Sequence, residues 1–108
     1  MSKFGELIDV DIPVLLDFFT EGNDQSTAMH PVLRDVAAAL GDKAKIIKID
    51  VDKNQELSVT YDVRSIPTVM IFQNSELKWR QTGSQTIQVL KSEIDKLLAS
   101  DSSQEEEE

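Results

Sequence analysis

Cysteine is absent from this chain of 108 residues. A disulfide, a thiolate nucleophile and a thiolate-bound metal therefore cannot form within it. The absence excludes every mechanism in which the protein's own thiol reacts. It carries no information about the redox state of the compartment in which the protein works.

Long apolar runs are also absent. No segment approaches the ~18 consecutive apolar residues that span a membrane. The first ten residues, MSKFGELIDV, hold one lysine and no extended apolar stretch, so we expect no signal peptide. From this we expect a cytoplasmic protein with no membrane partner. Nothing in the sequence calls for a cofactor or a metal, and we expect neither.

Basic side chains are scarce, with 11 Lys and Arg against 20 Asp and Glu, which gives a net charge of −9. Nothing resembles a basic patch, so nucleic-acid binding is disfavoured. Five of the acids lie in residues 101–108. We expect residues 100–108 to form a disordered acidic tail, which either solubilises the protein or attracts basic partners. Residues 1–99 have a length typical of a single domain, and we expect them to form one.

The spacing of apolar residues predicts alternating helices and strands. Val14 to Phe19, VLLDFF, is an apolar run broken by one acid, typical of a strand buried on both faces. Further strands are expected at residues 45–51, 68–72 and 77–81, and helices at residues 2–9, 54–61 and 87–98. The longest helix should begin at Asn23 or Asp24, contain a kink at Pro31 and end at Gly41.

Several local sequences in one register resemble the thioredoxin family over about residues 5–98. Where the family reads like VLVDFWAEWCGPC, residues 14–26 read VLLDFFTEGNDQS. Further matches are KIDVD at residues 48–52, YDVRSIPT at residues 61–68, FQNSEL at residues 72–77, and Gly83. The chain is similar to a bacterial thioredoxin-like protein that lacks the two family cysteines.

The resemblance implies the thioredoxin-like α/β fold, a three-layer sandwich with helices on both faces of a mixed sheet. Because the N-terminus is short, we expect four strands, with the usual first edge strand missing. The first two strands should be parallel with a right-handed crossover, and the last two should form a hairpin at Asn74-Ser75. The expected spatial order is 45–51, 14–19, 68–72, 77–81.

The resemblance places the family's two cysteines at Asn23 and Ser26. In the family the first is a thiolate stabilised by the helix dipole, and the second resolves the mixed disulfide. Asp24 and Gln25 stand for the intervening Gly-Pro, and Gly22 for the preceding Trp. All five motif residues are replaced, which looks like natural loss of the chemistry. We therefore expect no reductase activity, although the family consists of protein-disulfide oxidoreductases.

Asp17 matches the family's buried acid and Lys48 the lysine that faces it. We expect Asp17 to be an inherited polar residue that is solvated by water or paired with Lys48. A role in proton handling is the alternative.

Pro67 matches the family's cis-proline, so Ile66-Pro67 is expected to be cis. In the family the adjoining backbone pairs with extended substrate peptides, which requires no sulfur. The resemblance thus implies a peptide-binding surface, and the candidate residues are Ser65, Ile66, Pro67, Thr68 and Ser84. A role for Pro67 in the fold alone is equally weighted.

Five other polar or aromatic residues are candidates for a structural or a functional role. Ser26 as a hydrolytic nucleophile would need a base and an oxyanion site, so helix capping by Asn23, Asp24 and Ser26 is favoured. His30, the only histidine, is expected to pack or lie on the surface, and a metal pair with Asp24 is disfavoured. Trp79 is expected in the core or at an edge, with an interface anchor as the alternative.

These residues lead to three hypotheses of function. The first is a non-catalytic module, monomeric or weakly dimeric, that holds a protein or peptide without covalent chemistry. The second is a thioredoxin-family protein in cell redox homeostasis whose cysteines are supplied by a partner. The third, a different enzyme that uses Ser26 or Asp24, lacks a base and an oxyanion site.

Overall fold

The structure, a computed structural model, describes residues 3–106, and the side chains of residues 3–100. The elements follow in the order α1 (Lys3–Ile8), β1 (Val14–Phe19), α2 (Asp24–Leu40), η1 (Gly41–Lys43), β2 (Lys45–Asp50), α3 (Gln55–Thr60), β3 (Thr68–Gln73), β4 (Glu76–Thr82) and α4 (Ile87–Glu106). The element types agree with the sequence predictions, and the strand bounds agree to within one residue. The short 3-10 turn η1 was not predicted.

The strands form one mixed sheet of four in the order β2-β1-β3-β4. β1 and β2, joined by α2, are parallel, whereas β3 is antiparallel to both β1 and β4. The predicted strand order is therefore confirmed. The hairpin has one irregularity that the sequence did not indicate, a register shift between Ile71 and Phe72.

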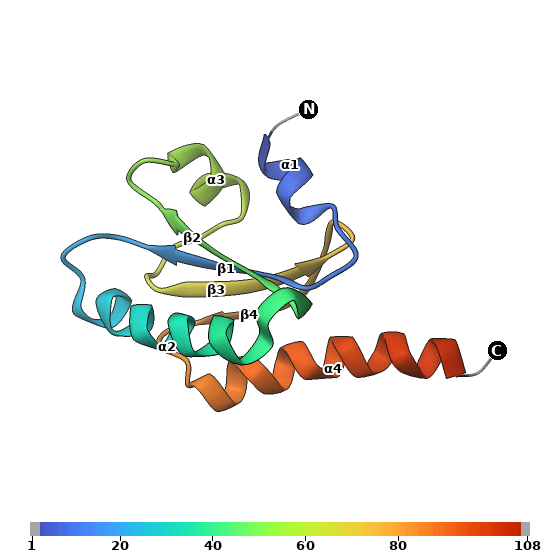
Figure 1. Cartoon of the computed structure of the whole chain (residues 1–108). Helices are drawn as coiled ribbons and strands as arrows, with labels where there is room; N and C mark the ends of the chain where they lie inside the picture. The colour runs from blue at the N-terminus through green and yellow to red at the C-terminus, as the bar shows by residue number, and fades with distance from the viewer. Residues whose placement is uncertain (1–2, 107–108) are drawn as a thin grey trace.

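Helices cover both faces of the sheet (Figure 1), which makes the expected three layers. On one face, Leu15, Val69 and Ile71 pack with residues of α2 and α4. On the other, Leu16 and Met70 pack with residues of α1 and α3. Successive side chains of a strand point to opposite faces, so an unbroken apolar strand needs a cover on each side.

The C-terminal helix is longer than the sequence predicts. α4 continues to Glu106, beyond its predicted end at residue 98. The expected disorder of residues 100–108 stays a prediction. No Gly or Pro follows Gly83, and Gln and Glu are good helix formers, so nothing in this segment breaks the helix. Residues 107 and 108 lie outside the described part of the chain, and the role of the acidic segment stays a prediction.

The strand register brings four chain segments together at the edge of the sheet formed by the ends of β1, β2 and β4 and the start of β3. Phe19 lies beside Asp50 because β1 and β2 are parallel. The antiparallel pairs Phe18 with Thr68, and Thr68 with Thr82, bring the start of β3 to the same edge. The turns that follow β1, β2 and β4 therefore meet the loop that precedes β3.

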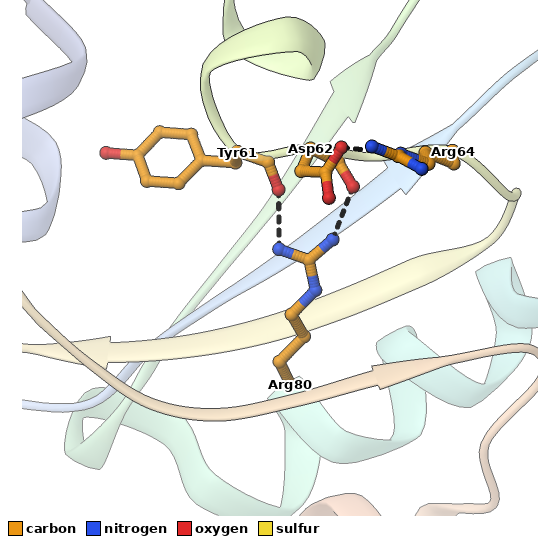
Figure 2. Close-up of polar contacts among 4 residues, drawn as sticks. All are labelled: Tyr61, Asp62, Arg64 and Arg80. Carbon is orange, nitrogen blue, oxygen red and sulfur yellow. Dashed lines mark hydrogen bonds and ion pairs between the residues drawn. The ribbon is translucent and has the colours of Figure 1, made fainter.

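Arg80 of β4 holds the loop before β3 in place through hydrogen bonds (Figure 2). Its guanidinium donates hydrogen bonds to the carbonyl oxygens of Tyr61 and, at 2.7 Å, of Asp62. Arg64 donates to the Asp62 carboxylate at 2.6 Å. Tyr61 is the C-terminal cap of α3, and Asp62 has a positive φ of 54°. Arg80 thus satisfies carbonyls that the end of a helix leaves without partners.

We expect Arg80→Met to lower the free energy of unfolding by about 1–3 kcal/mol, because two charge-assisted hydrogen bonds are lost while the aliphatic stem is kept. Urea unfolding followed by circular dichroism measures the change. Lys78→Met is the matched control on the same strand. Its exposed pair with Glu76 should contribute less than about 1 kcal/mol. Equal effects of the two substitutions would contradict this account of the loop.

Candidate functional site

The turn between β1 and α2 is a helix cap. Asn23 has an extended backbone, with φ −92° and ψ 122°, and its side-chain oxygen accepts a hydrogen bond from the Ser26 N–H at 2.8 Å. Its carbonyl accepts the N–H of Thr27 at 2.9 Å. Gly22, just before it, has φ 84°, a conformation that glycine adopts at little cost. The predicted capping role is confirmed for Asn23, and α2 begins at Asp24.

Ser26 is fully buried and belongs to the same hydrogen-bonded turn. Its hydroxyl oxygen accepts the N–H of Thr20 at 3.2 Å, and the Thr20 hydroxyl donates to Asp52 at 2.6 Å. The two positions that match the family cysteines therefore hold the turn together through oxygen and nitrogen. A buried hydroxyl that serves a backbone N–H is poorly placed to attack a substrate.

Asp17 lies on β1 below α2 and is fully buried. Neither carboxylate oxygen has a hydrogen-bond partner among the described residues. Lys48 is its neighbour in the β1–β2 register, yet the two make no ion pair, and the ammonium of Lys48 lies 6.0 Å from the ring centre of Phe19. Burial raises the pKa of Asp17 to about 6, and the charge of Lys48 opposes that rise. Lys48 therefore acts on Asp17 only through its charge at a distance, and not through an ion pair.

His30 packs as expected, with its ring edge-on to Phe19 and the two ring centres 5.4 Å apart. Its Nε2 atom is buried and has no hydrogen-bond partner within residues 3–106. Burial and the charges of Lys48 and Arg34 lower the pKa of His30. Across the same described residues, no group of three His, Asp or Glu side chains is placed to hold a metal ion.

The loop before β3 contains the expected cis bond between Ile66 and Pro67. The Thr68 hydroxyl donates to the Ser65 carbonyl at 2.6 Å, and the Gly83 N–H donates to the Pro67 carbonyl at 2.8 Å. Ser65 is exposed and Ile66 is half-buried. Within the described chain, the backbone N–H and C=O of Ile66 bind no other backbone group.

The turn between β4 and α4 joins α2 to this loop. The Gln85 N–H contacts the sulfur of Met29 at 3.3 Å, and the Gln85 side chain donates to the Gly83 carbonyl at 3.1 Å. Ser84, between them, is exposed. Sequence reasoning missed these contacts and the bond from Thr20 to Asp52, because no local pattern indicates a hydrogen bond between residues so distant in the chain.

Trp79 is partly buried against the core on the α2 and α4 side of the sheet. This agrees with the expected core or edge position. Over the described residues, no helix has both the length and the apolar character needed to cross a membrane.

A family model for thioredoxin matches residues 1–96. The thioredoxin of Rickettsia bellii is 37% identical over 78 residues, which cover 72% of this chain and 74% of that protein. The thioredoxin of Haemophilus influenzae is 36% identical over 78 residues, covering 72% and 73%. Among plant proteins, thioredoxin Y of the rice chloroplast is 33% identical over 98 residues, or 90% of this chain and 58% of that one.

Solved structures share the fold at lower sequence identity. One, from work on how a yeast mitochondrial 1-Cys peroxiredoxin is resolved through the glutathione and thioredoxin systems, has a TM-score of 0.80 at 22% identity and covers 89% of both chains. Thioredoxin-2, described as a component of the malaria parasite's protein secretion machinery, has a TM-score of 0.77 at 23% identity, covering 80% of this chain and 84% of its own.

Replacing the cap should weaken the start of α2. We expect Asn23→Ala to lower the free energy of unfolding by about 1 kcal/mol, because the Ser26 N–H loses its acceptor. Gln25→Ala is the control, since Gln25 is exposed in the same turn and should change stability by less than about 0.5 kcal/mol. Urea unfolding of both variants measures the two changes in stability. An unfolding midpoint that Asn23→Ala leaves unchanged would mean that the cap does not stabilise α2.

Asp17→Asn should stabilise the protein at high pH and leave its stability unchanged at low pH. The folded state holds the Asp17 proton up to about pH 6, whereas the ordinary pKa is 3.8, so unfolding releases a proton between these values and stability falls as pH rises. The full shift corresponds to about 3 kcal/mol, of which the unpaired amide offsets a part. We expect a gain of about 1–2 kcal/mol at pH 8 and none below pH 4.

Asp35→Asn, an exposed change on α2, is the control for Asp17→Asn and should show no such pH-dependent gain. Urea unfolding at pH 4, 6 and 8 gives the three free energies for each protein. Destabilisation by Asp17→Asn at pH 8 would mean that the ionised carboxylate is stabilised by a partner.

Proposed function

The chain belongs to the thioredoxin family but holds no cysteine, and we propose that it is a non-catalytic module that binds a protein or peptide in extended form. The observation that carries the proposal is the change of role at Asn23 and Ser26. The Asn23 side chain caps α2 and the Ser26 hydroxyl accepts the N–H of Thr20, so both positions hold the turn together without thiol chemistry. The protein would then not be an enzyme.

The proposed binding surface lies where residues 22–26, 65–68 and 84–85 meet at one edge of the sheet, with Ser26, Pro67 and Thr68 buried beneath it. Ser65 and Ser84 are exposed there, and Ile66 presents apolar surface together with backbone groups that lack a backbone partner in the described chain. An extended peptide pairs with such groups through its own N–H and C=O, and side-chain pockets then add specificity. This mode of binding requires no sulfur from either protein.

Family membership also supports a second role, in redox homeostasis, where the cysteines belong to a partner. The two roles differ in whether capture depends on a thiol. Bacterial relatives support a bacterial origin and, with it, a cytoplasmic place of work. The family's peptide-binding loop supports a partner of protein or peptide and gives no support to nucleic acid or membrane.

The test is capture from a lysate whose thiols are blocked with N-ethylmaleimide. We expect the immobilised protein to retain the same defined partner before and after blocking, and Ile66→Lys to lose at least nine-tenths of it. Val89→Lys on α4 is the control, because Val89 is partly exposed and lies outside the proposed surface. Thermal melts confirm that each variant folds.

Capture that disappears on blocking would favour the redox role, and equal capture by Ile66→Lys would remove the loop from the binding site. In parallel, the protein should leave the rate of insulin reduction by dithiothreitol unchanged, because it has no dithiol. A clear acceleration would overturn the assignment as a non-catalytic protein.

A further inference from the structure

A cationic cleft lies between α2 and the edge strand β2, on the side of the sheet that α2 covers. Its volume is about 180 Å³, and it is lined by His30, Leu33, Arg34, Ala37, Ile46 and Lys48. His30 and Arg34 are four residues apart on α2 and therefore share one side of that helix. Ile46 and Lys48 alternate with residues that face the opposite layer, so both point toward α2.

Among the side chains of residues 3–100, the cations of this cleft have no acidic partner. Ion pairs among the described side chains involve Arg64, Lys78, Lys91 and Lys96, and none involves Arg34 or Lys48. The buried Nε2 of His30 likewise has no hydrogen-bond partner in residues 3–106. In a chain with 20 acids and 11 bases, free cations that converge on one cleft are unexpected.

We propose that the cleft between α2 and β2 binds a small tetrahedral oxyanion, such as phosphate or a phosphate monoester, through Arg34, Lys48 and His30. Arginine offers a planar pair of N–H donors that matches such oxygens, and lysine adds a point charge. The imidazole of His30 supplies a further N–H donor, which the neutral ring also carries on one of its two nitrogens. The site is separate from the surface proposed for peptides and does not depend on it.

The negative charge of the whole protein does not prevent this binding. Surface charges are screened over about 8 Å at physiological ionic strength, so the cations lining the cleft outweigh the distant acids. The acid that faces the same layer from β1 is Asp17, which is fully buried beneath the sheet surface. Its ionisation would weaken anion binding, and its raised pKa of about 6 limits that effect in acidic solution.

His30 is the only histidine, so its imidazole proton resonances report on the cleft without assignment ambiguity. Phosphate is titrated into the protein at pH 5.5, below the pKa of about 6 of Asp17, with sodium chloride adjusted to hold ionic strength constant. We expect a saturable shift of the His30 resonances. Chloride alone should give none. O-phosphoserine is the second probe: tighter binding assigns the site to a phosphate monoester, and equal binding assigns it to the free anion.

Arg34→Gln and Lys48→Gln should each weaken phosphate binding at least tenfold. Lys45→Gln is the matched control, because Lys45 lies on the same strand, points to the opposite face and carries the same charge. It should bind within twofold of the unaltered protein. In sodium sulfate, which does not titrate in this range, the His30 pKa should rise relative to chloride, since a bound anion favours the imidazolium.

Three results would overturn the proposal. The first is a shift that grows linearly with phosphate and is matched by chloride. The second is equal binding by Arg34→Gln, Lys48→Gln and Lys45→Gln, which would show a non-specific charge effect. The third is an unchanged His30 pKa in sulfate. Circular dichroism of each variant confirms the fold, so a loss of binding is not mistaken for unfolding.

Discussion

Burial of the two central strands on both faces is the constraint from which the rest of this structure follows. Leu15, Leu16, Val69 and Met70 are all fully buried, although neighbours along a strand face opposite layers. Such strands need helices above and below them, which sets the three layers. The need to cover β1 and β2 from one side also places α2 across them, and this brings its first turn to the sheet edge where the four connecting segments meet.

At that edge, hydrogen bonds accepted by Asn23 and Ser26 hold the turn at the positions that match the two family cysteines. A helix that begins beside a buried strand has N–H groups to satisfy. Here the Asn23 side chain accepts the N–H of Ser26, and the Ser26 hydroxyl accepts the N–H of Thr20. The turn therefore keeps its place beside the cis-proline loop in a chain that has no cysteine.

The sequence was sufficient for features that local pattern determines. Strand order, the Asn23 cap and the Ile66-Pro67 bond followed from apolar spacing, from capping chemistry and from the resemblance. It was insufficient where distant residues meet in space. The hold of Arg80 on the loop before β3 has no local signal, because an arginine on a strand usually points to solvent.

Two features depend on surroundings that a local sequence does not indicate. Asp17 was expected to be solvated by water or paired with Lys48. The structure shows no ion pair between them, and the ammonium of Lys48 lies 6.0 Å from the ring centre of Phe19. A lysine on an edge strand keeps its ammonium hydrated more readily than it enters the core. The second feature is α4, which extends past its predicted end at residue 98 to Glu106 because no Gly or Pro interrupts it.

The positive φ of Gly22 limits which residues the turn between β1 and α2 can accept. A glycine at φ 84° is nearly free of strain, whereas the family's bulky tryptophan at that position would cost about 1–2 kcal/mol in the same backbone. A cysteine at position 23 would also remove the side-chain oxygen that accepts the Ser26 N–H, and a cysteine at position 26 would remove the hydroxyl that accepts the Thr20 N–H. The backbone conformation and the side chains of this turn therefore depend on each other. Exchanging one side chain at a time would strain the backbone or leave an N–H group without its acceptor.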